Sequence, residues 1–252
     1  MTAIASRLRF AIGALALGAV LAPEAGAQEL PPAKDLIDRY ARAVGGDKWK
    51  DHKSARMKAT MEVPSAGLSA NIEASTIFPS AFLMKMEIGG MGSIVTGFDG
   101  TTAWSKDPMM GPRILEGAEA DQVAEEADPA AALRQTTKIA SSETVEKTTI
   151  NDTECYKVKH TWKSGRVTHD CFSTFDGLLV ATIAKQASAM GEAEVTTIHS
   201  AYKDFGGIMR ASVVTAQMMG QEAKTTITSW EWDVVDPKDV ELPPDVKALI
   251  KK

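Results

Sequence analysis

The chain has 252 residues, of which 44% are hydrophobic and 24% charged, so disordered and collagen-like chains are excluded. Lys and Arg number 28 against 33 Asp and Glu, which gives a formal net charge of -5. This weak acidity argues against nucleic acid as a partner, because nucleic-acid-binding proteins present a basic face to the phosphates. Twelve Met beside only three Tyr and seven Phe predict an aliphatic, adaptable interior.

The N-terminus has the pattern of a secretory signal peptide. Two arginines precede a 13-residue apolar run (10–22), which is shorter than the roughly 20 residues that a membrane span needs. Small residues follow, and we expect cleavage after Ala27. Removal of 1–27 leaves 28–252 as an exported, soluble, periplasmic protein. No cysteine lies near the cleavage position, which argues against a lipid-anchored lipoprotein.

The mature segment is expected to begin with a helix and to continue as strands. Leu36, Ile37 and Tyr40 recur at helical spacing, and Gly45 and Gly46 end the helix. After Trp49 the hydrophobic period becomes two, which is typical of half-buried strands. The expected strands are 54–63, 68–78, 82–88, 94–98, 101–104, 143–150, 153–162, 166–173, 178–187, 193–202, 208–219 and 222–235.

One helical segment, 116–134, is expected to interrupt the strands, with a break at Pro129. It has no strand partner in sequence, so we expect it to cover the open face of the sheet as a lid. A fixed core helix is the alternative. The apolar side of this segment consists of small residues that allow close but weak packing, namely Val123, Ala124, Ala127 and Ala131. A last short helix is expected at 244–250.

Sequential hairpins, with turn-forming residues between the runs, build an antiparallel meander. A meander of about eleven strands curls to hide its edges and its apolar face. No linker or shift in composition divides the chain. We therefore predict one mainly β domain, 28–252. It is expected to be a strongly curved meander that forms an open half-barrel, with an N-terminal helix and a helical lid insertion.

Cys155 and Cys171 are the only cysteines, and an oxidising compartment allows them to pair. The runs 153–162 and 166–173 resemble a hairpin with a three-residue turn, in which Cys155 opposes Ser173. Cys171 then lies one diagonal step away on the same face, near the upper limit for a disulfide unless a bulge shifts the register. We predict a disulfide between them. Two small buried thiols are the alternative.

Motifs for catalysis, metal binding or cofactor binding are absent from the sequence. There is no G-x-S-x-G, H-E-x-x-H, P-loop or G-x-G-x-x-G. His160 and His169 fall on opposite faces of the expected hairpin, so the histidines are interpreted as structural or surface residues. We therefore expect no catalytic residues, no metal and no cofactor.

Apolar side chains of neighbouring strands are expected to share one face. If the sheet curls inward on this face, these side chains line a cavity, and a filled core is the alternative. The candidate cavity-lining residues are Met57, Met61, Phe82, Met84, Met86, Trp104, Trp230 and Trp232.

Four Met-Gly pairs lie in expected turns, at Met91, Met110, Met190 and Met219. Successive turns of a meander alternate between its two ends. If the helical insertion keeps this alternation, all four methionines lie at one rim of the cavity. Flexible thioethers suit a mouth that accepts apolar chains of variable shape. In the alternative interpretation the glycine forms each turn and the methionine only plugs the end of the barrel.

Four segments resemble the bacterial outer-membrane lipoprotein-sorting-like proteins, which are similar in architecture to the LolA/LolB lipoprotein carriers. These segments are 36–46 (LIDRYARAVGG), 97–104 (GFDGTTAW), 175–179 (FDGLL) and 202–208 (YKDFGGI). The resemblance implies a curved antiparallel sheet that cups a hydrophobic cavity, with helices as a lid. It further implies that the cavity holds acyl chains of a lipid or lipoprotein in transit across the periplasm.

Two main hypotheses for the function follow. The first is a monomeric periplasmic carrier of lipid or lipoprotein acyl chains that moves cargo between membrane-bound donor and acceptor proteins. The second is an exported, non-catalytic interaction module whose curved sheet binds a protein partner and whose interior is ordinary core. An exported enzyme of unrecognised type is a third interpretation, for which the sequence offers no positive argument.

Overall fold

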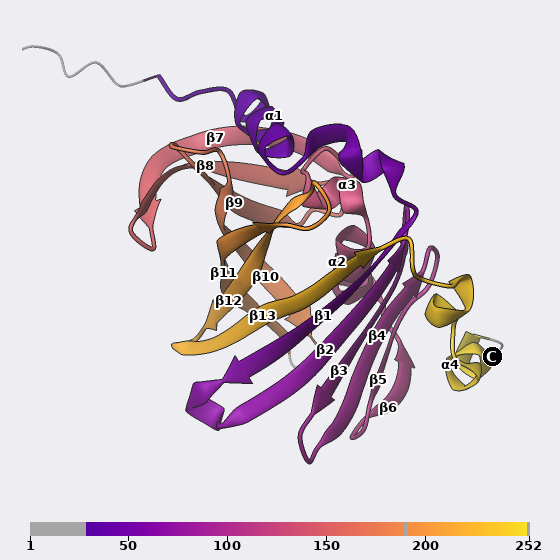
Figure 1. Ribbon diagram of the computed structural model, residues 1–252. Coiled ribbons are helices and arrows are strands. Elements are labelled where there is room, and N and C mark those ends of the chain that lie inside the picture. Colours follow the sequence, from indigo (N-terminus) through magenta and orange to yellow (C-terminus); the bar gives the residue numbers. More distant parts are fainter. Residues whose placement is uncertain (1–28, 189–190, 251–252) are drawn as a thin grey trace, which may run out of the picture.

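The computed structural model describes residues 29–188 and 191–250 (Figure 1). The expected signal peptide, its cleavage position and Met190 lie outside these residues. The strands are β1 (Ser54–Val63), β2 (Leu68–Ile77), β3 (Ala81–Ile88), β4 (Gly92–Asp99), β5 (Ala103–Asp107), β6 (Gly111–Ile114), β7 (Ile139–Ile150), β8 (Thr153–Trp162), β9 (Val167–Ser173), β10 (Leu179–Ser188), β11 (Gly191–Asp204), β12 (Met209–Met218) and β13 (Gln221–Trp232).

The α-helices are α1 (Ala33–Ala43), α2 (Gly117–Glu126), α3 (Pro129–Ala132) and α4 (Pro244–Ile250), and three short 3-10 helices are η1 (Gly46–Asp51), η2 (Pro64–Ala66) and η3 (Pro237–Val240). None of the helices in the described part of the chain is long and apolar enough to cross a membrane.

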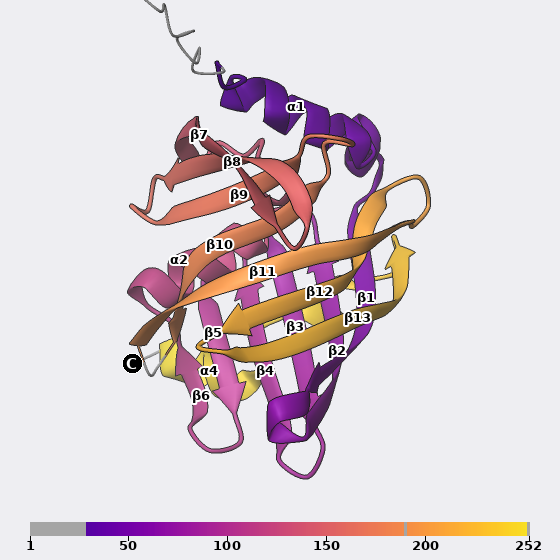
Figure 2. The ribbon, with the colours of Figure 1, turned by 90° about the vertical axis from the view of Figure 1, so that its left-hand side faces the viewer.

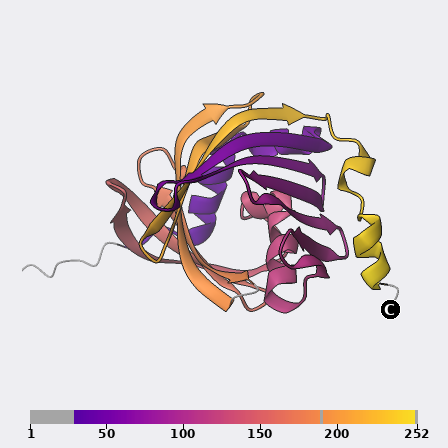
Figure 3. The same cartoon turned by 90° about the horizontal axis from the view of Figure 1, so that it is seen from below.

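The strands form one antiparallel sheet with the order β6-β5-β4-β3-β2-β1-β13-β12-β11-β10-β9-β8-β7. Every pair of neighbours is consecutive in sequence except β1 and β13, which meet near the middle of the sheet. Seen from below, the sheet curls almost into a ring around α2 and α3 (Figure 3). The prediction of a mainly β, open half-barrel is confirmed, with thirteen strands in the described residues rather than about eleven.

The helices cover different parts of the sheet (Figures 1 and 2). Helix α1 lies across the β7–β9 end, where Leu36 and Tyr40 pack against Val158 and Phe172. Helices α2 and α3 lie within the curve, and α4 lies outside it beside β6. The helical insertion is broken where expected, because the Asp128 side chain caps α3 by accepting a hydrogen bond from the Ala130 amide at 2.9 Å.

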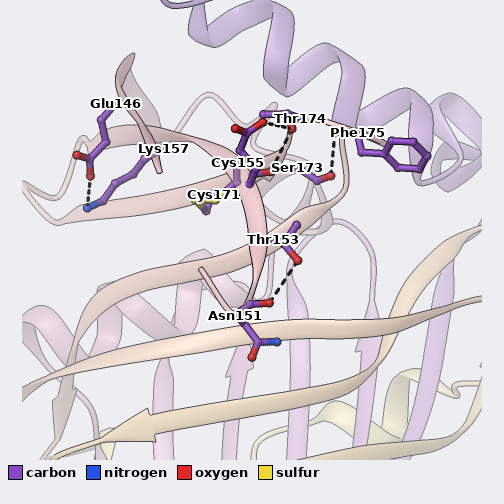
Figure 4. Close-up of a disulfide and its surroundings, with 10 residues drawn as sticks. Glu146, Asn151, Thr153, Cys155, Lys157, Cys171, Ser173, Thr174 and Phe175 are labelled. Carbon is purple, nitrogen blue, oxygen red and sulfur yellow. Dashed lines mark hydrogen bonds and ion pairs between the residues drawn. A yellow bond between two sulfur atoms is a disulfide. The ribbon is translucent and has the colours of Figure 1, made fainter. Parts of the chain in front are cut away.

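The predicted disulfide between Cys155 and Cys171 is present, with the two Cα atoms 5.5 Å apart (Figure 4). Cys155 opposes Ser173, as the hairpin turn predicts, and Cys171 opposes Lys157. The bridge therefore joins a diagonal pair in a regular register, and the bulge considered for this pairing is not needed. Both cysteines are buried, in a small cluster with Val180 and Ala181 on the face opposite α1.

Candidate functional site

Five of the expected cavity residues lie on one face of β1 and β3. In the register of the sheet Met57 opposes Ala74, and Ala74 opposes Met84. Phe82 on the same face of β3 packs against α2, which identifies this face as the concave one. The side chains that share it and remain half-buried are Met57, Met61, Phe82, Met84 and Met86.

Trp230 and Trp232 extend this face onto β13, where Trp230 opposes Met57. The Trp232 indole donates a hydrogen bond to the Phe205 carbonyl oxygen at 2.7 Å. Its ring stacks on His52 with the ring centres 4.4 Å apart, so Trp232 is held as part of the packed end of the sheet. Trp230 is therefore the indole that continues the row of concave side chains.

Trp104 lies elsewhere, and this is a correction to the expected cavity. It opposes Gly97 and Ile114, on the face opposite to Phe82, and packs against Leu242 and Val246 of the C-terminal segment with no exposed surface. Strand alternation explains the difference, since the even-numbered positions of β5 face outward while those of β3 face inward. A Cβ at Gly97 would lie 2.5 Å from the Trp104 ring, so glycine is needed where the indole crosses β4.

The turns that hold Met91, Met110 and Met219 lie at one end of the sheet. The first two connect β3 to β4 and β5 to β6 (Figure 2). The third connects β12 to β13, and it lies at the same end because Glu62, near the end of β1, opposes Lys224, near the start of β13. The exposed fractions of the three methionines are 52%, 58% and 90%, so none of them plugs the barrel.

Two cavities beneath the helices are lined by residues that the sequence did not indicate. One, of about 200 Å³, lies between α1, α3 and the strands β11 and β12, and Arg210 and Tyr202 face it. The other, of about 260 Å³, lies between α2, α3 and the strands β9 to β11. Both are lined by Arg134 and His199. None of the expected cavity residues lines either of them.

A fully buried carboxylate, Asp170, binds Arg134, which lines both cavities. Arg134 binds it with Nε and with Nη2, the latter 3.1 Å from Oδ1. The Thr182 hydroxyl donates to it at 2.7 Å, and His160 Nε2 lies 3.2 Å from Oδ2. Burial alone raises the pKa of Asp170, but Arg134 and His160 outweigh burial and hold that pKa well below its usual range.

His160 lies between Ser142 and Asp170. Its Nδ1 shares a hydrogen bond of 2.7 Å with the Ser142 hydroxyl. Its Nε2 is buried 3.2 Å from Asp170 Oδ2, a contact at ion-pair distance without hydrogen-bond geometry. The interpretation of His160 as a structural histidine fits this arrangement, in which every contact holds the ring in place.

His199, which lines both cavities, should make the free energy of unfolding depend on pH. Burial lowers the pKa of His199 to about 4, and Arg134 and Arg210 add to this effect. The unfolded chain takes up the proton near pH 6.5, whereas the folded protein does so only near pH 4. The contribution of neutral His199 to the free energy of unfolding is therefore full above pH 6.5 and decreases as the pH drops toward 4. The expected loss between pH 7 and pH 5 is about 2 kcal/mol. It is measured by urea unfolding at both values. His199→Gln keeps a polar group beside Thr182 and should reduce this fall, leaving the part due to His169, whose pKa burial also lowers. An equal fall in the variant would contradict the assignment.

The arrangement described here defines a class: open, one-sheet half-barrels that hold helices within their curve. No protein family model and no curated protein sequence matches the chain. Among solved structures, a LolA superfamily protein from Nitrosomonas europaea is similar, with a TM-score of 0.58 at 11% identity, covering 84% of this chain and 99% of that one.

Two further structures show the same architecture. An outer membrane lipoprotein-sorting protein domain from Vibrio parahaemolyticus has a TM-score of 0.54 at 8% identity, covering 87% of this chain and 100% of that one. A DUF1329 family protein from Desulfovibrio piger has a TM-score of 0.56 at 12% identity, covering 84% and 98%. The chain therefore has the LolA-like fold, as the resemblance in sequence implied.

Proposed function

We propose that the protein is a non-catalytic periplasmic carrier that binds lipid or lipoprotein acyl chains on its concave face and conveys them toward the outer membrane. The observation that carries the proposal is the half-buried methionine surface of β1 and β3. Helix α2 packs against Phe82 and Phe98, whereas Met57, Met84 and Met86 belong to none of the four hydrophobic clusters. Apolar surface of this kind on a curved sheet suits a flexible apolar ligand.

The energetics of such binding need no charged anchor. Burying an acyl chain gains about 0.8 kcal/mol per methylene, so a twelve-carbon stretch gains roughly 9 kcal/mol before ordering costs. This corresponds to affinities in the micromolar range. Because an exported protein has no ATP to drive release, loading and unloading follow differences in affinity between membrane-bound donor and acceptor proteins.

The exposed methionines and α2 have roles in this proposal. Met91, Met110 and Met219 form a flexible rim through which a chain enters. Helix α2 acts as the lid. Besides its apolar contacts, two ion pairs hold it: Arg166 Nη1 lies 2.7 Å from Glu125 Oε2, and Arg113 Nη1 lies 2.7 Å from Glu119 Oε2. The lipoprotein-sorting description of the similar Vibrio domain supports the choice of cargo.

Met84→Arg is the test of this function. We expect the variant to fold and to lose uptake of a neutral fluorescent fatty alcohol. On an open concave surface the new charge is hydrated, and a bound apolar chain would have to remove that water. Titration by fluorescence gives the affinity, and circular dichroism checks the fold. Met109→Arg is the matched control, since Met109 is 94% exposed in the β5–β6 turn and the variant should bind like the wild type.

Two results would contradict the proposal. An unfolded Met84→Arg protein would show that Met84 is packed core. A wild-type protein that takes up no lipid probe would favour the interaction module, in which the curved sheet binds a protein partner.

A further inference from the structure

A guanidinium without a counter-ion faces the cavity of about 200 Å³ beneath α1 and α3. Arg210, near the start of β12, lies between two indoles, with its Cζ 4.8 Å from the ring centre of Trp49 and 3.9 Å from that of Trp230. Within residues 29–188 and 191–250, no carboxylate pairs with Arg210 and no acceptor receives its N–H groups. Arg134 differs, because it is bound to Asp170.

The two indoles beside Arg210 also have unused donors. Trp49 Nε1 and Trp230 Nε1 are buried, and neither has an acceptor among the described residues. Trp162 and Trp232 do have acceptors, the Thr168 hydroxyl and the Phe205 carbonyl oxygen. Trp104 Nε1, which lies on the opposite face of the sheet, has none among the described residues. Buried N–H groups in folded proteins are nearly always paired. Two such groups beside an unpaired guanidinium therefore indicate a place for an acceptor that is not part of the chain.

The charge of Arg210 is retained at neutral pH. Burial lowers the pKa of Arg210 to about 10, which leaves the guanidinium protonated. Its ionisable neighbours include Tyr40, Tyr202 and His199, which are uncharged at neutral pH and supply no counter-ion. Arg210 is half-buried, so its charge is only partly removed from water, and the two ring faces offset that loss in part. An anion at this place would form charge-assisted hydrogen bonds with the guanidinium.

The site is continuous with the concave surface. Trp230 opposes Met57, Met57 opposes Ala74 and Ala74 opposes Met84, which makes one row across four strands. Three inter-strand spacings separate the ends of this row, or about 14 Å. A ligand with an anionic head at Arg210 can thus lay an apolar tail along the row to Met84.

We propose that Arg210, with the N–H groups of Trp49 and Trp230, binds the carboxylate of a long-chain fatty acid whose tail lies on the methionine surface. This inference deepens the proposed function and rests on it. A planar carboxylate matches the fork of a guanidinium, and one unpaired cation balances a single negative charge. Among the lipid and lipoprotein chains of the proposed function, this narrows the cargo to free fatty acids, since linked acyl chains carry no free carboxylate.

The test compares tetradecanoate, tetradecan-1-ol and tetradecyl phosphate by displacement of the neutral probe at pH 7.5. We expect the wild type to bind the acid about 10- to 100-fold more tightly than the alcohol, the range for hydrogen bonds to charged groups. Arg210→Met should abolish this preference and leave the affinity for the alcohol within about two-fold. Arg42→Met, which removes an exposed charge on α1, is the matched control and should keep the preference.

Three other outcomes of this test would each overturn a different part of the proposal. Equal binding of acid and alcohol by the wild type would overturn the carboxylate site and leave the carrier function standing. Tighter binding of the alkyl phosphate would overturn the choice of carboxylate. Binding of none of the three ligands would overturn the carrier function itself. Trp230→Phe keeps an aromatic ring and removes one N–H, so it should reduce the preference for the acid even if Arg210→Met does not fold.

Discussion

Replacing Asp170 by alanine is expected to lower the free energy of unfolding by about 3–5 kcal/mol. The carboxylate has no exposed surface, and it is the partner of Arg134, Thr182 and His160. Its loss leaves the Arg134 guanidinium in the wall of two cavities without a counter-ion. Urea unfolding at pH 7, followed by tryptophan fluorescence and by circular dichroism, measures the change.

A double-mutant cycle separates the ion pair from the packing. Arg134→Met alone should also destabilise the protein, because it leaves Asp170 buried and unpaired. The double variant, Asp170→Ala with Arg134→Met, should lose less than the sum of the two single losses, by about 1–3 kcal/mol. Additive losses would show that the two side chains stabilise the protein by packing alone and that the ion pair between them contributes nothing.

Loss of the disulfide is the second large effect that we expect. Cys155 and Cys171 are 16 residues apart, and closing a loop of this length stabilises a protein by about 3 kcal/mol in the chain-entropy model. The variant with both cysteines replaced by alanine should be destabilised by about this amount. The measurement is the midpoint of urea unfolding, with and without a thiol reductant.

The reduced wild type serves as the comparison for this variant. Reduction keeps both sulfur atoms in the cluster with Val180, whereas alanine removes them. If the cross-link itself stabilises the protein, the reduced wild type and the double variant should lose similar stability. Two thiols that alkylate in the unreduced protein, seen by intact mass, would refute the bridge in solution.

The fold was largely predictable because its signals are local. The hydrophobic period of two predicts both the first and the last residue of β1 and of β8, and Pro129 predicts the break between α2 and α3. The sequence does not indicate strand β6, because this strand is four residues long and begins with Gly111 and Pro112, residue types that are typical of turns. Its pairing with β5 follows from tertiary structure, which no short sequence window contains.

The site was only partly predictable. Alternation of apolar residues along β1 and β3 predicts that Met57 and Met84 lie on the apolar face of the sheet. It does not predict whether Trp104 of β5 lies on that face or on the opposite one. The expected hairpin register already put Asp170 and His160 on one face, and that signal could have suggested a buried pair. Nothing in the sequence near Arg134 or Arg210 shows that both reach the interior. Arg134 lies in the loop after α3 and Arg210 lies in β12. Both become interior residues only because the curled sheet brings that loop and that strand together.

The pairing of β1 with β13 has a consequence for how the chain folds. All other strand pairs form between neighbours in sequence, whereas Ala55 must find Trp232 across nearly the whole chain. Closing so long a loop costs entropy before any contact offsets it, which slows the last step. Two half-sheets can therefore assemble early, but they join only after the final strand has been synthesised. Until then, β1 and β12 each present an open edge to other chains, so a truncated protein is expected to aggregate.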